Sequence, residues 1–285
     1  MMKKKVKTLR GLKTGYLIHR NPGKPVLLFL HGFPDDPFIF KEQFEALKGS
    51  YEIIAPYMRG VDESDAKKGL CRFDLDALTL DYLELLEFLA PDRPLFIICH
   101  DLGVPQAARL APLLRKRLCG LICLAGLPIS LMLHRLKSPR QHVRSFYMHF
   151  FQVPMMPQML LSRFELSLLN IAYTLGSLPK ELRPKLKENR MKNSFNHYRA
   201  YLRAALKKDV RRPKPIDTKT LFLWGAGDRL ILPPTLDELS QDFWQVTVRI
   251  LKGGHWFFRE NPKDVHLIIN DFIEEALNDK RADGT

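Results

Sequence analysis

An aspartate at the end of an apolar run is the first candidate for chemistry. Residues 94–99 read PLFIIC, and His100, Asp101, Leu102 and Gly103 follow directly. A buried strand that enters a helix through such a turn is typical of a nucleophile elbow, which forces the central side chain up at the edge of a sheet. The alternative interpretation is that Asp101 only caps the following helix. The chain contains no G-x-S-x-G string, so the sequence offers no serine in this role.

Two further residues complete a catalytic set. Asp228 follows the apolar run 221–224 and its glycine turn, and His255 follows a pair of glycines after a later apolar run. The order nucleophile, acid, histidine is one of the known triad orders. A histidine alone in a glycine turn is typical of a structural residue, but an acid placed to orient it indicates a base. The set predicts that Asp101 attacks a substrate carbon and that His255 then activates water.

Backbone amides near Asp101 would stabilise the negative charge of such a reaction. Phe33 lies in the loop after the apolar run 25–30, and Leu102 directly follows Asp101. We expect their N–H groups to form an oxyanion hole. The residues expected to shape the supporting loop are His31, Gly32 and Pro34.

The segments that would position these residues alternate between strands and helices. After two strand-like stretches near the start come six apolar runs, at 25–30, 51–55, 94–99, 118–124, 220–224 and 245–251. Helical spacing is found in 42–47, 73–89, 103–115 and 262–277. Continuous apolar strands that alternate with helices are typical of a mostly parallel sheet covered on both faces. The predicted fold class is therefore α/β.

A basic helical segment interrupts this alternation after the sixth strand. Residues 131–212 contain 17 Lys or Arg against 4 Asp or Glu, which accounts for nearly all of the net charge of +14. An insertion at this place in an open α/β sheet predicts a lid over the strand ends, where such sheets bind ligands. We therefore expect a core domain of residues 1–127 and 213–285 and a helical cap of residues 128–212.

The basic charge of the expected cap leaves several interpretations open. A solvated lysine-rich face is the simplest, and attraction of an anionic substrate or contact with an anionic membrane surface are the alternatives. No nucleic-acid-binding motif accompanies the charge, so nucleic acid is not an expected partner. No apolar run reaches the ~20 residues that a membrane-spanning helix needs. The sequence does not indicate an oligomeric state.

The cysteines and the N-terminal stretch bear on the compartment. Cys99, Cys119 and Cys123 lie in apolar runs, and neither they nor Cys71 show the spacing of metal ligands. We therefore expect neither structural zinc nor a disulfide framework. The basic start of the chain has no apolar h-region behind it, which together with free cysteines predicts a soluble, cytoplasmic protein.

Four short motifs together resemble the epoxide hydrolase branch of the α/β-hydrolase family. The family's H-G-x-P loop, G-H-D-x-G elbow, W-G-x-x-D-like turn and terminal G-H-W correspond here to HGFP at 31–34, CHDLG at 99–103, WGAGD at 224–228 and GHW at 254–256. The similarity extends from about Lys13 to Leu277. Cys99 stands in place of the usual glycine, and Leu102 in place of the common tryptophan. The resemblance implies an α/β-hydrolase fold with Asp101 as the nucleophile.

The family also carries two cap tyrosines that hold the epoxide oxygen. One precedes an F-Q-x-P segment, which matches residues 151–154 and places Tyr147 in the corresponding position. The other lies in an N-x-Y-R helix, which matches residues 196–199 and Tyr198. Tyrosines in an aromatic cap can also serve packing alone. The resemblance implies instead that both phenols, neutral at pH 7, hydrogen-bond and protonate the oxygen.

The resemblance implies hydrolysis of a small apolar epoxide to a vicinal diol through an ester on Asp101, without a cofactor or a metal. A haloalkane or haloacid dehalogenase with the same Asp-His-Asp triad is an alternative, but it needs donors for a departing halide, and Leu102 replaces its usual tryptophan. A non-catalytic hydrolase-fold protein that binds a ligand through the cap is a third interpretation. Such proteins commonly lose a triad member, whereas this chain retains all three.

Overall fold

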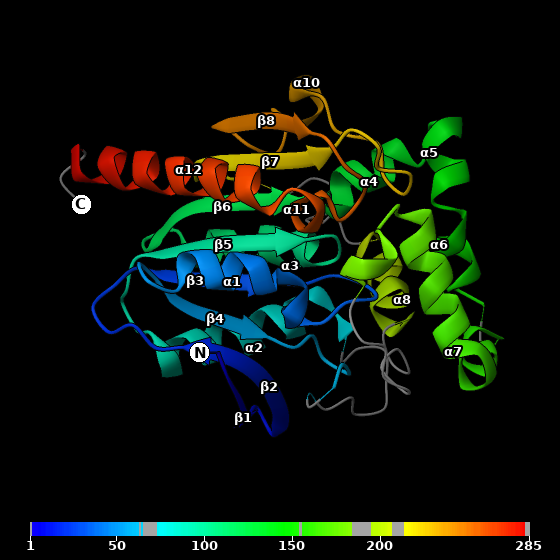
Figure 1. The fold of residues 1–285 in the computed structure, drawn as a ribbon, viewed down its shortest axis with the longest axis horizontal. Helices are drawn as coiled ribbons and strands as arrows, with labels where there is room; N and C mark the ends of the chain where they lie inside the picture. Colours follow the sequence, from blue (N-terminus) through cyan, green and yellow to red (C-terminus); the bar gives the residue numbers. More distant parts are fainter. Residues whose placement is uncertain are drawn as a thin grey trace.

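An eight-stranded sheet forms the centre of the molecule in the computed structural model, which describes residues 2–62, 64, 73–153, 156–183, 195–206 and 214–282. The strands are β1 (Lys3–Leu9), β2 (Leu12–His19), β3 (Val26–Leu30), β4 (Glu52–Pro56), β5 (Leu95–His100), β6 (Leu118–Leu124), β7 (Thr220–Gly225) and β8 (Val246–Leu251). Their order across the sheet is β1-β2-β4-β3-β5-β6-β7-β8 (Figure 1). The pairs β1–β2 and β2–β4 are antiparallel, and all the others are parallel. This confirms the predicted α/β fold with a mostly parallel sheet.

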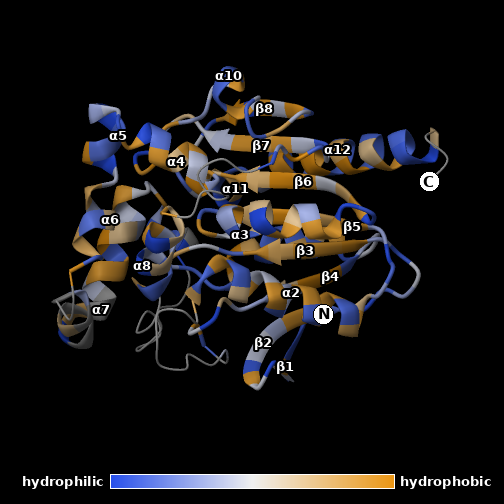
Figure 2. Ribbon diagram, turned by 180° about the vertical axis from the view of Figure 1, so that it is seen from behind, coloured by the Kyte–Doolittle hydropathy of each residue, from blue (hydrophilic) through white to orange (hydrophobic). Residues whose placement is uncertain are grey.

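The apolar runs become central strands because both faces of the sheet are covered. Every residue of β3, β5 and β6 is buried, and these strands stand out as hydrophobic in Figure 2. Helices α1 (Lys41–Leu47) and α12 (Pro262–Ala282) lie on one face, and α2 (Leu75–Leu89) and α3 (Gly103–Leu110) lie on the other (Figures 1 and 2).

Two predicted helix boundaries show how local chemistry sets the ends of these helices. The helix predicted over 73–89 begins at Leu75, because the Asp74 side chain caps it by accepting a hydrogen bond from the Asp76 amide. The helix predicted over 103–115 ends earlier, at Leu110, and continues as a 3-10 turn over Ala111–Leu114. Pro112 has no N–H to extend the α-helical pattern, which explains the change.

The order of the strands reverses at β3, because β4 and β5 lie on opposite sides of it. This reversal marks the edge of the sheet where ligands are expected to bind. From β3 the chain moves to β4 on one side, whereas β5 pairs with β3 on the other side. Open α/β sheets bind ligands at such a point, beyond the carboxyl ends of the strands. The loop after β3 and the turn after β5 both end there, because Leu30 pairs with Cys99.

A group of helices inserted between β6 and β7 lies at this same edge of the sheet (Figure 1). The inserted helices are α4 (Ile129–Arg135), α5 (Pro139–Arg144), α6 (Phe146–Phe150), α7 (Met156–Leu175) and α8 (Phe195–Ala204). Helix α7 has a non-helical backbone conformation at Phe164. Pro154, which ends the F-Q-x-P match, and Cys71 lie outside the described residues. Within the described part of the chain, no helix is long and apolar enough to cross a membrane.

Candidate active site

The turn after β5 holds Asp101 in a left-handed backbone conformation, with φ of +49°. Left-handed φ values are uncommon for residues other than glycine, and they mark strained, over-determined positions. A Cβ atom added at Gly103 would lie 2.2 Å from the Leu30 carbonyl oxygen, so only glycine allows strand and helix to approach this closely. The N-cap position of α3 is Leu102, which makes no side-chain capping bond. The alternative interpretation of Asp101 as a helix cap does not match this geometry.

The Asp101 carboxylate is buried and held by backbone amides. Its Oδ1 atom accepts a hydrogen bond of 2.9 Å from the Phe33 amide, and the Leu102 amide also bonds to the carboxylate. The residue is 6% exposed. Burial raises the pKa of Asp101 above its usual range, against the opposing effects of His255 and the two amides. The expected oxyanion donors therefore both face this carboxylate.

The loop after β3 is fixed by His31. The Met58 amide donates a 2.9 Å hydrogen bond to His31 Nε2, so the proton of the ring is on Nδ1, which lies 2.9 Å from the Gly32 carbonyl oxygen. A Cβ atom at Gly32 would lie 2.4 Å from Asp101 Cβ. The hydrogen bonds of His31 thus fix the loop, and the close approach of the loop to Asp101 leaves room only for glycine at position 32.

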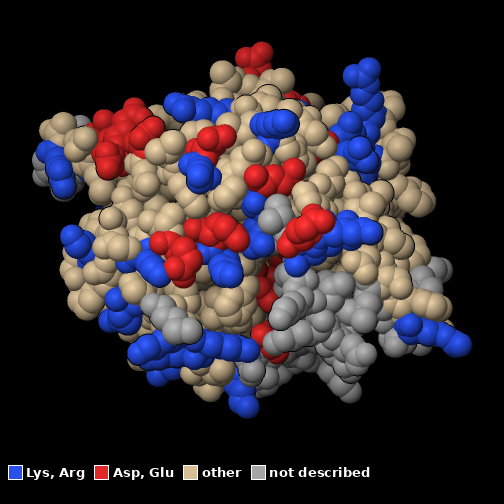
Figure 3. All heavy atoms as spheres, in the orientation of Figure 1, with Lys and Arg blue, Asp and Glu red and all other residues tan. Residues whose placement is uncertain are grey.

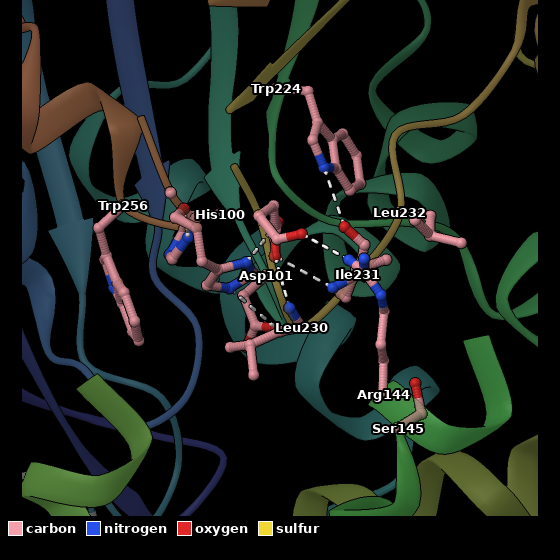
Figure 4. A network of polar contacts seen from close by, with 12 residues as sticks. His100, Asp101, Arg144, Ser145, Trp224, Leu230, Ile231, Leu232 and Trp256 are labelled. Atoms are coloured by element: carbon pink, nitrogen blue, oxygen red, sulfur yellow. Dashed lines mark hydrogen bonds and ion pairs between the residues drawn. The ribbon is translucent and has the colours of Figure 1, made fainter. Parts of the chain in front are cut away.

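His255 and Asp228 form a buried pair at the ends of β8 and β7. His255 Nδ1 donates to Asp228 Oδ2 over 2.8 Å, while Asp228 Oδ1 accepts from the Leu230 and Ile231 amides at 2.8 and 3.0 Å. Figure 4 shows Leu230 and Ile231 beside Asp101, with Trp224 donating to the Ile231 carbonyl oxygen. This network orients the acid toward the imidazole and fixes the imidazole tautomer.

The second nitrogen of His255 points to the nucleophile. Nε2 lies 3.7 Å from Asp101 Oδ2 and makes no hydrogen bond within the described residues. Burial lowers the pKa of His255, but the carboxylates of Asp228, Asp101 and Asp35 outweigh this effect and raise the pKa overall. The imidazole is therefore a stronger base than an ordinary histidine, and it lies beside the carboxyl group of Asp101.

Tyr147 on α6 and Tyr198 on α8 face Asp101 from the inserted helices. Their ring centroids are 6.1 Å apart in an edge-to-face arrangement, and their hydroxyl groups are hydrogen-bonded to each other. Burial raises the pKa of both phenols, and the negative charge of Asp101 raises it further. Both groups are therefore neutral hydrogen-bond donors at pH 7.

Two apolar cavities meet at Asp101, Tyr147 and Tyr198. One, of about 90 Å³, extends between α3, α4 and α8 and is lined by apolar residues such as Leu127 and Met132. The other, of about 180 Å³, extends toward α7 and is lined by Phe33, Pro34, Leu168 and Trp256. A larger surface hollow of about 830 Å³, near α2 and α3, contains none of the candidate catalytic residues. The arrangement places three polar groups at the junction of two apolar arms.

Sequence reasoning missed several buried polar residues around this site. Asp35, 2% exposed, accepts hydrogen bonds from Trp256 Nε1 at 2.7 Å and from the Tyr173 hydroxyl at 3.0 Å. Gln106 and Tyr201 form a second buried group under the elbow. Two signals were available in the sequence: Asp35 directly follows HGFP, and Gln106 lies inside a mostly apolar helix. Within the described residues, no three His, Cys, Asp or Glu side chains gather as a metal site.

Comparisons with known proteins identify the family of this chain. The family model for the alpha/beta hydrolase fold matches residues 25–262. Epoxide hydrolase 3 of Mus musculus is 26% identical over 277 residues, which cover 94% of this chain and 75% of that protein. Epoxide hydrolase 4 of Mus musculus is 26% identical over 283 residues, which cover 93% of this chain and 77% of that protein.

Solved structures show the same fold. An epoxide hydrolase of Bacillus megaterium in complex with an inhibitor matches with a TM-score of 0.80 and 19% identity, covering 95% of this chain and 100% of that chain. This chain therefore belongs to the α/β-hydrolase family, as an enzyme of the epoxide hydrolase-like type.

Proposed function

We propose that this enzyme hydrolyses an epoxide to a vicinal diol through a covalent ester on Asp101. The observation that carries the proposal is the junction of the two cavities, where one carboxylate and two phenols line the same space. A carboxylate supplies the nucleophile, and phenols supply the protons that the opened ring requires. The relatives named epoxide hydrolases support the same reaction.

In the first step, Asp101 Oδ2 attacks one ring carbon and the bond from that carbon to the ring oxygen breaks. Oδ1, held by the Phe33 amide, becomes the carbonyl oxygen of the new ester. The released alkoxide oxygen takes a proton from Tyr147 or Tyr198. A neutral phenol is required for this transfer, and the raised pKa of both groups keeps them protonated.

In the second step, His255 Nε2 takes a proton from a water molecule, which attacks the carboxyl carbon of Asp101. The Phe33 and Leu102 amides stabilise the oxyanion that forms. Asp228 stabilises the imidazolium through the 2.8 Å bond to Nδ1. Collapse of the intermediate releases the diol and restores the carboxylate, and the proton on His255 returns to the phenolate.

The buried indoles weigh against the dehalogenase alternative. A departing halide would need ring N–H donors facing the cavity, but Trp256 Nε1 donates to Asp35 and Trp224 Nε1 donates to the Ile231 carbonyl oxygen. The remaining tryptophan, Trp244, is 67% exposed. The non-catalytic alternative is disfavoured because the nucleophile, acid and base are all present and in mutual reach.

The two apolar cavities suggest the form of the substrate, and the place of the inserted helices suggests the domain boundaries. Because an apolar cavity extends to each side of Asp101, we propose a small epoxide with an apolar substituent on each ring carbon. We propose that residues 128–212 act as a helical cap and that residues 1–127 and 213–285 form the core domain. The cap would exclude bulk water from the site and leave only the water molecule that His255 activates.

The charge of the cap allows a finer version of this proposal, in which the substrate or a contacted membrane surface is anionic. Figure 3 shows Lys and Arg side chains over the upper right of the molecule, where Figure 1 shows α5. Turnover of acidic epoxides should then decrease with ionic strength while that of neutral epoxides does not. Equal salt dependence for both would contradict the version with an anionic substrate.

Three buried cysteines without disulfides support a cytoplasmic location, which cell fractionation tests.

The test of the main proposal is to trap the ester. His255→Gln removes the base, so incubation with an epoxide should add the full mass of the epoxide to the protein, measured by intact-mass spectrometry. The matched control Asp101→Asn/His255→Gln should show no adduct. An increase in mass equal to that of a haloalkane minus HX, with no adduct from any epoxide, would instead establish dehalogenation. No adduct from either panel would favour the non-catalytic alternative.

A further inference from the structure

A buried polar cluster beneath the nucleophile turn joins α8 to the core. The side-chain amide of Gln106 donates to the Tyr201 hydroxyl oxygen, 2.7 Å away, and to the Leu102 carbonyl oxygen, 3.1 Å away. The Tyr201 hydroxyl donates to the same carbonyl oxygen over 3.2 Å. The Tyr82 hydroxyl donates to the side-chain oxygen of Gln106. Gln106 has no exposed surface, and the two tyrosines are 6% or less exposed.

The cluster touches the catalytic groups on both sides. Leu102 directly follows the nucleophile, and its amide bonds to the Asp101 carboxylate. Tyr201 lies one helical turn beyond Tyr198 on α8, so the two tyrosines occupy neighbouring positions on the helix surface. The bond from Tyr201 to the Leu102 carbonyl oxygen therefore connects the helix that carries a phenol to the turn that carries the carboxylate.

Other contacts of α8 extend this connection to the second phenol. His197, directly before Tyr198, bonds through Nε2 to the Arg59 carbonyl oxygen at 2.9 Å. The Arg199 guanidinium donates to the carbonyl oxygens of Phe151 and Val153, both at 3.0 Å. Phe151 directly follows α6, the helix of Tyr147, and Val153 lies two residues further along the chain. The place of α8 on the core therefore sets the place of both phenols.

We propose that Gln106 and Tyr201 are positioning residues, which hold Tyr198, and through α8 also Tyr147, at the separation from Asp101 that ring opening requires. This inference rests on the proposed function. Neither residue supplies a proton or a nucleophile, because their polar groups are engaged with each other and with Leu102. Their effect is on the geometry of the ring-opening step.

The experiment measures the rate of ester formation in the His255→Gln background, where the ester persists. Tyr201→Phe removes only the hydroxyl group, and we expect ester formation to slow about tenfold, since small misplacements of reacting groups have effects of this size or larger. The final amount of ester should stay complete. Tyr82→Phe is the matched control, because it removes a buried hydroxyl whose hydrogen bond goes to the side-chain oxygen of Gln106 and neither to α8 nor to Leu102, and its rate should stay within about twofold.

Several results would overturn the inference. A rate in Tyr201→Phe equal to that of the parent would show that the link is not needed. Incomplete ester at an unchanged rate would show a structural role, since a fraction of the protein would then be inactive. Equal slowing in Tyr82→Phe would show that any loss from the cluster has the same effect.

A second variant tests whether the two residues act as a pair. Gln106→Met keeps the length of the side chain, and it should slow ester formation to a similar extent. The double variant Tyr201→Phe/Gln106→Met should be no slower than the slower single variant, whereas multiplied effects would contradict a shared role. No adduct in the His255→Gln parent would overturn the proposed function itself, and this inference with it.

Discussion

The backbone amide of His255 donates a 3.0 Å hydrogen bond to the carbonyl oxygen of Gly176, at the end of α7. The two residues come from opposite ends of a segment that includes α8 and β7. A Cβ atom at Gly176 would lie 2.0 Å from Cζ3 of the Trp256 ring. The inserted helices therefore contact the loop of His255, the proposed base, directly through the backbone.

Gly176→Ala should displace this loop. The added methyl group overlaps the buried Trp256 ring, so we expect a cost of about 1–3 kcal/mol in the free energy of unfolding. Turnover should fall about 10- to 100-fold as His255 shifts. Chemical denaturation and steady-state kinetics measure the two effects. Gly49→Ala is the matched control, since a Cβ atom there has no neighbour within 4 Å. Equal effects of both substitutions would contradict the proposed contact.

Asp101→Asn should abolish ester formation. An amide of nearly the same size keeps the packing but lacks the negative charge of the nucleophile, so turnover should decrease by about 10⁴-fold or more. Steady-state diol formation measures the change. Because the removed carboxylate is buried and its pKa is raised, the variant should be at least as stable as the parent. Substantial remaining turnover would show that another group attacks the ring.

The two phenols should share the acid role. Tyr147→Phe and Tyr198→Phe should each slow ring opening by about 10²-fold, which is at the lower end of the range for general acids, and the double variant should be slower than either. The measurement is ester formation in the His255→Gln background. Tyr51→Phe, which removes a buried hydroxyl far along the chain from the site, serves as the control. Unchanged rates in both single variants would show that these tyrosines contribute only to packing.

The pH dependence should differ between the two steps. Hydrolysis of the ester needs neutral His255, whose pKa is raised above 6.5 overall by carboxylates that outweigh burial. As the pH falls through this value the base becomes protonated, and hydrolysis slows. Ring opening continues until Asp101 is protonated, at a pKa raised from 3.8 by burial. The wild-type enzyme quenched at about pH 6 should therefore carry more ester than at about pH 8. Less ester at the lower pH would contradict this assignment.

A buried ion pair between α2 and the segment after β4 should contribute to stability. Arg59 and Asp81 are joined by a hydrogen bond, and their side chains are 5% and 7% exposed. Burial raises the pKa of Asp81, but Asp81→Asn also removes the charge that pairs with the buried guanidinium of Arg59. We therefore expect a loss of about 3 kcal/mol in the free energy of unfolding. On the same helix, Asp76 pairs with Arg109 at an exposed position, and Asp76→Asn should cost less than about 1 kcal/mol. Comparable losses in both variants would contradict the role of burial.

Much of the fold and of the proposed catalytic set follows from local sequence features. Continuous apolar runs predict buried parallel strands, and each chemical motif comes directly after one of these runs. Parallel strands end at the same edge of a sheet, so the order of motifs along the chain was enough to bring Asp101, Asp228 and His255 together. The structure places them as a contiguous group, with 2.8 and 3.7 Å between partners. The early end of α3 was the main error in secondary structure, because Pro112 ends the α-helical pattern within the range predicted as a helix.

The sequence by itself thus determined the sheet and the place of the inserted helices, and it supplied the residues of the proposed catalytic set. Only the tertiary structure decided which buried polar groups meet, as in the contacts of Gln106 with Tyr201 and of Gly176 with His255. Periodicity shows that a side chain faces the interior, but not which distant element lies opposite it. A buried hydrogen bond depends on the relative placement of two such elements to within a few tenths of an ångström, and that placement results from packing of the whole core.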